Sequence, residues 1–226
     1  MLARVTPAQL WQMLQPPRWR SVGQSTDGRP LWLRSWGDGP GGVLLHGAIH
    51  GDEPLGAYCL LRLAEELDAA PPSRAVAVWP VVNPDGYLAG RKNNGRDVDL
   101  NRNFAAANWT ADLGEGYFPG AAPGSEPETQ ALVAWIEATR PARIITLHSP
   151  FRMVNYDGPA RALAEAMSAA NGYPVTADMG YPTPGSFGTY YGVERGMPVI
   201  TLEIPRMTPE QAWAENRAAL LAATLP

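Results

Sequence analysis

The feature that most constrains the fold is an alternation of short apolar runs with longer segments of helical periodicity along 226 residues. We predict strands at residues 31–33, 43–45, 75–82, 144–147 and 199–204. We predict helices at residues 55–67, 126–138, 160–170 and 209–223. Because the strands are apolar almost throughout, they are expected to be covered on both faces. The pattern therefore predicts an α/β fold around a mixed, largely parallel central sheet.

The length favours one compact domain, residues 1–226, over two independent cores. Apolar residues make up 45% of the chain and charged residues 18%, which is the composition of a folded protein. A net charge of -4 and a pI near 5.4 argue against nucleic acid or a membrane surface as a partner. We recognise no signal peptide and no segment of transmembrane length, so we expect a soluble, cytoplasmic protein. Cys59 is the only cysteine, and we expect it to be an inert core residue of a helix.

All three histidines fall at the end of a predicted strand or in the loop after one. His46 follows the run 43–45, His50 lies four positions further on, and His148 follows the run 144–147. Folds of this class bind ligands beyond the carboxyl ends of their strands. The histidines therefore indicate where chemistry should be sought.

The segment from His50 to Glu53 offers an imidazole and a carboxylate, both of which are good zinc ligands. Pro54 favours the first position of a helix, which puts Glu53 at or beside the N-cap. A second interpretation is that Asp52 and Glu53 only cap that helix. If His148 adds a third ligand, one position stays open for water, as in catalytic zinc sites. Asp52 is a candidate for orienting one of the imidazoles.

Glu203 lies inside an otherwise apolar strand. Burying an unpaired ionised group costs on the order of several kcal/mol, so a glutamate inside this strand needs an explanation. One reason is a general base beside the metal, and the other is a structural ion pair, for example with Arg206.

A hydrolase that acts on a carboxylate-bearing substrate needs donors that hold the anion in a fixed pose. Arginine can do this with two parallel hydrogen bonds and asparagine adds a neutral donor, and Arg91 and the segment Asp99–Phe104 supply both residue types, although Arg91 or Arg102 taken singly is more often a surface residue. A further arginine could stabilise the oxyanion that develops on the scissile carbonyl.

The ordered set of motifs resembles the zinc carboxypeptidases of the M14 family. The motifs are His50–Glu53, Asn83–Gly86, Arg91–Asn93, Asp99–Phe104, His148 and Thr201–Glu203, between about residues 42 and 205. The resemblance implies a single-domain α/β/α sandwich. It also implies one zinc ion (Zn2+) per chain on His50, Glu53 and His148, with Glu203 as general base. By the same match Arg91 polarises the scissile carbonyl, Asn101 and Arg102 bind the terminal carboxylate, and Tyr181 contacts the substrate.

Within the family, the stretches 106–109, 124–132 and 180–188 are similar to the murein peptide amidases. This likeness implies a cytoplasmic enzyme of cell-wall recycling that cleaves the γ-D-glutamyl-meso-diaminopimelate bond of murein tripeptide. Its partner would be a small muropeptide, and we expect a monomer or homodimer. Two departures bear on specificity. The spacing from Arg91 to Asn101 is one residue longer than in many relatives, and Ser149 stands where aspartate is expected. Arg152 and Asp157 are candidates for a diaminopimelate pocket.

Three other functions remain open at this point. The first is another M14-type carboxypeptidase activity, and the second is an N-acyl amino acid deacylase of the aspartoacylase and succinylglutamate desuccinylase kind. The third is a muropeptide-binding protein built on an inactive peptidase fold. The Asn83–Gly86 motif favours a peptidase over a deacylase, and the presence of Glu203 with all three potential zinc ligands favours an active enzyme.

Overall fold

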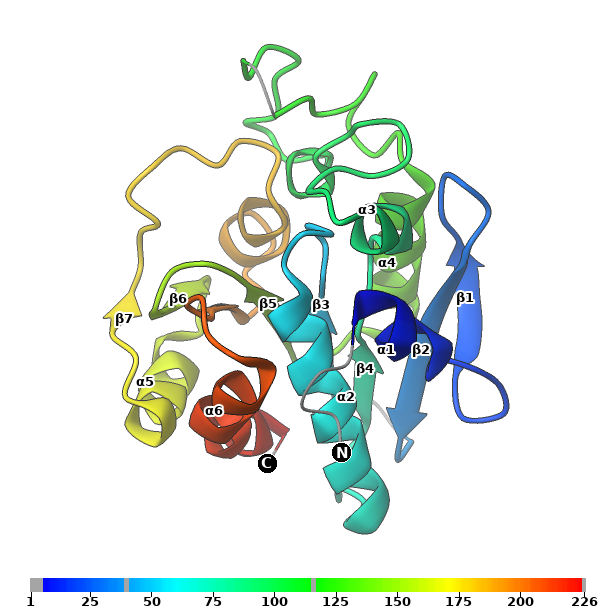
Figure 1. The fold of residues 1–226 in the computed structure, drawn as a ribbon. Coiled ribbons are helices and arrows are strands. Elements are labelled where there is room, and N and C mark those ends of the chain that lie inside the picture. The colour runs from blue at the N-terminus through cyan, green and yellow to red at the C-terminus, as the bar shows by residue number, and fades with distance from the viewer. Residues whose placement is uncertain (1–5, 39–40, 115–116, 225–226) are drawn as a thin grey trace.

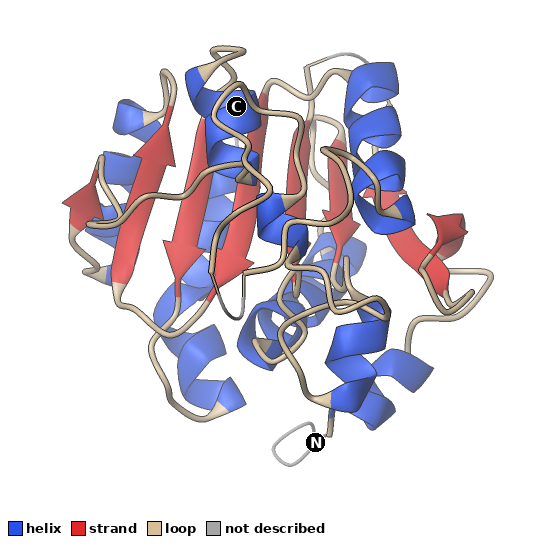
Figure 2. Cartoon of the chain, turned by 90° about the horizontal axis from the view of Figure 1, so that it is seen from above, coloured by secondary structure: helices blue, strands red, loops and turns tan. Residues whose placement is uncertain are grey.

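The computed structural model describes residues 6–38, 41–114 and 117–224 (Figure 1). Its strands form one eight-stranded sheet in the order β1-β2-β4-β3-β5-β8-β6-β7, seen from above in Figure 2. The strands are β1 Arg20–Gln24, β2 Pro30–Trp36, β3 Val43–Gly47, β4 Val76–Trp79, β5 Arg143–His148, β6 Met153–Asp157, β7 Val175–Thr176 and β8 Val199–Glu203. The helices are α1 Pro7–Gln12, α2 Pro54–Ala69, α3 Pro84–Ala89, α4 Pro127–Thr139, α5 Arg161–Asn171 and α6 Pro209–Thr224, with short helices η1 Leu100–Arg102 and η2 Gly188–Val193.

The four central strands of the sheet are parallel, and the strand next to them on each side is antiparallel. Strands β4, β3, β5 and β8 run in one direction, whereas β2 pairs with β4 and β6 pairs with β8 in the opposite one. The carboxyl ends of β3, β5 and β8 consequently meet at one edge of the sheet. This confirms the mixed, largely parallel sheet, and it brings the segments that carry the histidines and Glu203 together.

The predicted elements are all present, with shifted boundaries. The run 75–82 is a shorter strand than predicted, because β4 ends at Trp79 and Pro80, which has no N–H to donate to the sheet, follows it. Strand β6 was not predicted from the sequence, because Asn155 and Asp157 interrupt its apolar character. Strands β1 and β7 and helices α1, α3, η1 and η2 were also not predicted, and the strands among them carry mixed polar and apolar residues.

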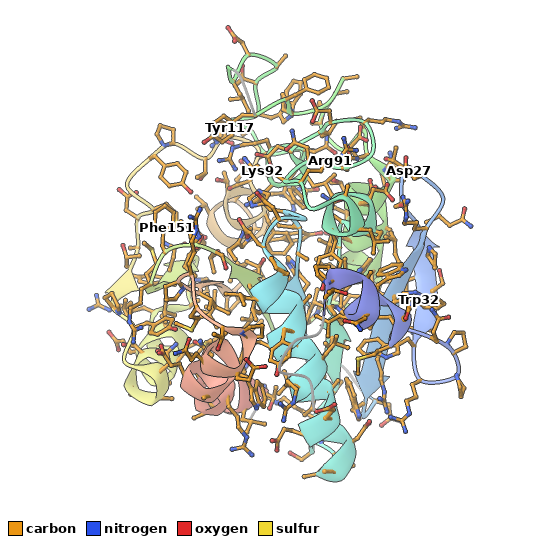
Figure 3. All side chains as sticks on the ribbon, in the orientation of Figure 1. Asp27, Trp32, Arg91, Lys92, Tyr117 and Phe151 are labelled. Carbon is orange, nitrogen blue, oxygen red and sulfur yellow. The ribbon has the colours of Figure 1, made fainter. Side chains whose placement is uncertain are left out.

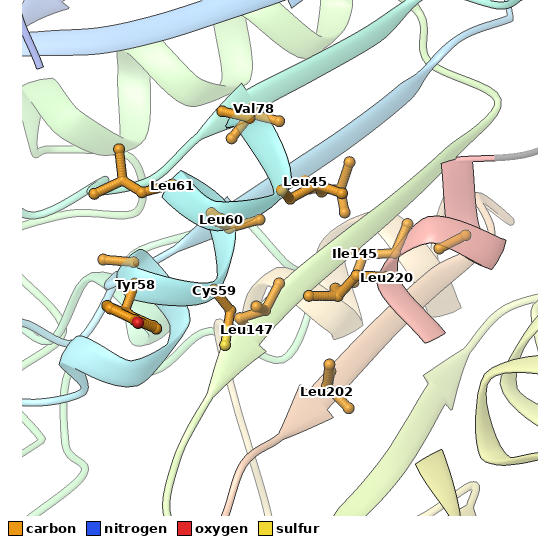
Figure 4. Packing of buried hydrophobic residues seen from close by; sticks show 14 of the residues in the cluster. Leu45, Tyr58, Cys59, Leu60, Leu61, Val78, Ile145, Leu147, Leu202 and Leu220 are labelled. Carbon is orange, nitrogen blue, oxygen red and sulfur yellow. The ribbon is translucent and has the colours of Figure 1, made fainter. Parts of the chain in front are cut away.

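Two apolar layers cover the sheet. On one face, side chains such as Leu45, Ile145 and Leu202 pack against helices α2, α5 and α6, part of which Figure 4 shows. On the other face, Leu44 and Ile144 belong to a cluster that includes residues of α4 and η2. Adjacent strand residues point to opposite faces of the sheet, so Leu44 and Leu45 belong to different apolar layers. This arrangement is the predicted α/β/α sandwich.

Cys59 lies in α2, inside the first of these layers (Figure 4). Burial raises the pKa of its thiol to about 12, so it stays protonated near neutral pH. Cys59 is therefore a core residue, as the sequence predicts. In the described part of the chain, no helix is both long and apolar enough to cross a membrane.

Candidate active site and metal centre

The loop between β3 and α2 brings two of the three potential metal ligands together. Glu53 is the N-cap residue of α2 and Pro54 begins the helix, yet the Glu53 side chain forms no capping hydrogen bond. One of its carboxylate oxygens lies 2.9 Å from His50 Nδ1, and the other lies 3.0 Å from His148 Nδ1. The capping interpretation of Glu53 is therefore wrong, since its carboxylate is turned toward the two imidazoles.

The close packing of this loop depends on Gly51. A Cβ atom at that position would lie 2.1 Å from the carbonyl carbon of Gly86, which is far inside any van der Waals contact. Asn83 adds to the packing, because its side chain accepts from the Gly86 N–H and donates to the carbonyl of Ile49. The Asn83–Gly86 motif therefore holds helix α3 against the metal-ligand loop.

Asp99 orients His50, a role that the sequence suggested for Asp52. Its Oδ1 lies 3.1 Å from His50 Nε2, and its side chain is fully buried. Asp52 is exposed. A carboxylate on the second ring nitrogen fixes the imidazole and increases its basicity as a ligand. Sequence alone could have suggested Asp99 only because it opens the Asp99–Phe104 motif.

The electrostatics of the three side chains favour a cation. Burial alone would lower the pKa of His50, but the carboxylates of Glu53 and Asp99 outweigh it and raise this pKa to about 9. Burial acts against the Glu53 carboxylate as well, yet His50 and His148 lower its pKa to about 2. Negative charge that stabilises a proton on His50 also stabilises a bound metal ion.

The donor set fits a zinc ion. One ligand atom each from His50, Glu53 and His148 lies within 4.8 Å of the others. Two nitrogens and a carboxylate are the ligands of many catalytic zinc sites, at about 2.0–2.2 Å from the ion. We conclude that this group can hold one metal ion, and that its composition suits zinc.

Glu203 lies beside the metal-ligand group. It ends β8 directly opposite His148 of β5, and only 4% of its surface is exposed. Its carboxylate accepts a hydrogen bond from the Phe151 N–H at 3.3 Å and forms no ion pair with Arg206 or any other described residue. Burial, together with the nearby Glu53 charge, raises the pKa of Glu203 above its ordinary value. A carboxylate of raised pKa at this place is suited to accept a proton.

A cavity of about 580 Å³ connects these groups with the residues predicted to bind a carboxylate. Asn101 and Arg102 both line it. The Asn101 oxygen accepts from the Phe187 N–H at 2.9 Å, which leaves its NH2 group to donate. Arg102 is buried except for 5% of its surface, and one of its guanidinium nitrogens donates to the Asn101 carbonyl. Both side chains therefore offer donors to an anion in the cavity.

Arg91 is not brought to this cavity. The residue is exposed, and its guanidinium donates to the Asn94 carbonyl at 2.8 Å. Its neighbour Lys92 lines the cavity instead, with its ammonium 2.6 Å from Asp99 Oδ2 and 4.1 Å from the ring centre of Tyr117. In Figure 3, Lys92 is labelled beside Tyr117, and Arg91 is labelled between Lys92 and Asp27.

The remaining predicted residues are divided between the cavity and the surface. Tyr181 lines the cavity with 43% of its surface exposed, and its ring centre lies 6.5 Å from that of Phe151. Asp157 also lines the cavity, whereas Arg152 is exposed and pairs with Glu215 at 3.0 Å. Arg152 is therefore excluded as a pocket residue by its position.

Two further residues have defined places. Ser149 lines the cavity, and its backbone N–H donates to Glu53 at 3.1 Å, so it helps to orient that ligand. His46 is fully buried against the Phe187 ring, with centres 4.8 Å apart, and burial lowers its pKa to about 3. It is a neutral core residue, unlike the other two histidines.

Comparison with known proteins agrees with this geometry. The sequence profile of the zinc carboxypeptidase family, Peptidase M14, matches residues 15–171. The chain belongs to the M14 family of zinc carboxypeptidases. That profile includes the three potential zinc ligands, and Tyr181 and Glu203 lie beyond the matched range.

Similarity to individual M14 proteins extends further along the chain. The chain is 35% identical to murein peptide amidase A of Escherichia coli K12 over an alignment of 212 positions, which covers 87% of this chain and 85% of that one. The crystal structure of murein-tripeptide amidase MpaA from Escherichia coli O157 superposes with a TM-score of 0.79 at 30% identity, covering 93% of this chain and 94% of the other. Carboxypeptidase A from Helicoverpa armigera has a TM-score of 0.77 at 19% identity, covering 96% of this chain and 70% of that one, and shares the fold.

Proposed function

We propose that this M14 enzyme is a zinc-dependent amidase that hydrolyses the γ-D-glutamyl-meso-diaminopimelate bond of murein tripeptide. The observation that carries the proposal is the meeting of three potential zinc ligands and a buried carboxylate at one cavity, in a chain similar to murein peptide amidases along most of both lengths. The activity is that of an exopeptidase-like hydrolase, which releases the residue bearing a free carboxylate.

In this proposal each cavity residue has a separate task. His50, Glu53 and His148 would hold a zinc ion, which would supply Lewis-acid chemistry when bound. Glu203 accepts the proton of the attacking water and returns it to the leaving amine, the two halves of general acid–base catalysis. Positioned proton transfer of this kind contributes roughly 100- to 10,000-fold to the rate.

Substrate binding uses charges of both signs. Asn101 and Arg102 bind the carboxylate of the released residue, and Tyr181 contacts the substrate from the cavity mouth. Diaminopimelate also carries a distal amino group. Asp157 suits this group, because its carboxylate lines the cavity and has no cationic partner among the described residues. Burial raises the pKa of this carboxylate. An ammonium group beside Asp157 would compensate that buried charge.

The test is incubation of the zinc-loaded protein with murein tripeptide, followed by mass spectrometry of the products. We expect free diaminopimelate and the dipeptide that ends in D-glutamate. N-acyl amino acids and ordinary peptides with an α-linked terminal residue are run in parallel. Turnover of either of these, without cleavage of the tripeptide, would refute the proposed substrate. Binding of the tripeptide with no turnover of any substrate would identify a muropeptide-binding protein.

We also propose that the enzyme works in the cytoplasm as a monomer or homodimer, as its resemblance to recycling amidases implies. Cell fractionation with an antibody tests the compartment, and size-exclusion chromatography with light scattering tests the oligomeric state. A periplasmic location or a higher oligomer would contradict this part of the proposal.

A further inference from the structure

We propose that Lys92, and not Arg91, is the residue whose positive charge acts on the scissile carbonyl. This inference rests on the proposed hydrolase activity and concerns which group assists it. The spacing from Arg91 to Asn101 is one residue longer than in many relatives. Counted from Lys92, the spacing is one residue shorter, so this departure disappears.

The backbone of Lys92 is fixed against the metal-ligand loop. Its carbonyl oxygen accepts from the Gly51 N–H at 3.0 Å and from the Asn83 side chain at 3.0 Å. Helix α3 ends at Ala89, and its C-cap residue Gly90, two positions before Lys92, adopts the left-handed conformation. Two hydrogen bonds on one carbonyl hold the start of the Lys92 side chain in a constant position relative to His50.

The side chain of Lys92 contacts neighbours of both the metal-ligand group and the carboxylate-binding residues. Its ammonium pairs with Asp99, whose other oxygen contacts His50. The same ammonium lies over the ring of Tyr117, and the guanidinium of Arg102 lies 5.4 Å from that ring centre. A substrate whose terminal carboxylate binds Arg102 presents its scissile carbonyl between Arg102 and the metal. Lys92 is the lining residue that places a positive charge in this interval.

The chemistry of lysine suits the task. Its ammonium is a compact charge with three rotatable donors on a flexible stem, so one N–H can remain with Asp99 while another turns to a carbonyl oxygen. With 30% of the side chain exposed, the ammonium is accessible to a ligand. Arg91 is exposed as well, but its guanidinium donates to the Asn94 carbonyl and the residue is not among those that line the cavity.

The competing explanation is that Lys92 only neutralises Asp99. The Asp99 side chain is fully buried, and its Oδ2 has no hydrogen-bond partner among the described residues apart from this ion pair. Loss of Lys92 would then impair the enzyme indirectly, by disturbing the carboxylate that orients His50. The experiment must separate direct action on the substrate from action through Asp99.

The first comparison uses the adjacent pair. Lys92→Met and Arg91→Met remove the charge and keep an unbranched side chain, and kcat, KM, zinc content and melting temperature are measured for each. Removal of one oxyanion-stabilising donor costs about 100- to 1,000-fold in kcat, which we expect for Lys92→Met with little change in KM. Lys92→Arg should recover part of the loss, and Arg91→Met should stay within about threefold of the parent. The inference is overturned if Arg91→Met shows the larger loss, or if Lys92→Met keeps the parent kcat.

The second comparison is a double-mutant cycle with Asp99→Asn, measured at saturating zinc. Asn at position 99 no longer needs a neutralising cation, so a purely structural Lys92 would become dispensable in that background. We expect instead that Lys92→Met still lowers kcat by about 100-fold or more when added to Asp99→Asn. No further loss would show that Lys92 acts only through Asp99. The cycle also keeps the test informative if Lys92→Met alone fails to fold.

These measurements use whichever carboxylate-bearing substrate the parent enzyme turns over. If murein tripeptide is not cleaved but another substrate is, the proposed function fails while the Lys92 test proceeds on that substrate. If the tripeptide is cleaved and Lys92→Met is fully active, only the present inference fails.

Discussion

Replacement of Asp99 by asparagine tests how the protein holds its metal ion. The Asp99 carboxylate is fully buried and lies 3.1 Å from His50 Nε2, so solvent does not screen this contact. Asparagine keeps an oxygen that can accept the same hydrogen bond, but it loses the negative charge. The substitution therefore isolates the charge from the hydrogen bond.

The expected magnitude follows from the contact. A hydrogen bond to a charged group contributes about 1.5–3 kcal/mol, compared with about 0.5–1.5 kcal/mol for a neutral one. The difference of roughly 1–1.5 kcal/mol corresponds to about tenfold in zinc affinity. Loss of residues that orient a metal-ligating histidine generally weakens metal binding by about 10- to 100-fold, which includes this value. We therefore expect the Kd for zinc to rise by about tenfold or more.

The assay is a competition for zinc between the protein and a chromophoric chelator at fixed pH. Asp52→Asn is the matched control, because it makes the same chemical change on an exposed residue two positions from His50. Its zinc affinity should equal that of the parent. If Asp99→Asn bound zinc as tightly as the parent, or if both variants were weakened equally, the assignment of Asp99 as the orienting carboxylate would be refuted.

Three further substitutions test the rest of the site. Glu203→Gln should retain zinc and the fold while losing about 100- to 10,000-fold in turnover, and near-parental turnover would mean that another group moves the proton. Amidation of the released residue's carboxylate should lower kcat/KM of the parent by roughly tenfold or more, and should affect Arg102→Ala less, because its donors are already gone. An equal loss in both proteins would show that Arg102 does not bind that carboxylate. Gly51→Ala should destabilise the fold by about 1–3 kcal/mol and lower the zinc content, since its Cβ would lie 2.1 Å from Gly86. A thermal melt that matches the parent would contradict that close approach.

The sequence predicts most of the fold because the deciding signals are local. Strands such as 43–45 and helices such as 55–67 are recognisable from the periodicity of consecutive residues, which depends only on backbone geometry. Strand β6 was missed for the same reason, because Asn155 and Asp157 are polar residues that face the cavity side of an antiparallel strand. These two residues are polar because they line the cavity, and their polarity hides the strand from an analysis of apolar periodicity.

Residue type alone could not choose between neighbouring side chains, although the spacing to Asn101 favours Lys92 over Arg91. Arg91 and Lys92 are both basic, and each is a reasonable candidate from its residue type alone. Only the hydrogen bonds of Gly51 and Asn83 to the Lys92 carbonyl, together with the end of α3, determine which side chain enters the cavity. The same holds for Asp52 and Asp99, since the burial and distance that select Asp99 involve residues 49 positions apart.

By itself the sequence determined the kinds of residue available for chemistry and the local elements that carry them, including a histidine and a glutamate at the start of one helix. The tertiary structure decided how these elements meet. The parallel register of β5 and β8 sets Glu203 opposite His148, and the packing of Gly51 against α3 brings the first metal ligands to the same edge of the sheet. Such contacts depend on the free energy of the whole packed core, which no short segment of the chain contains.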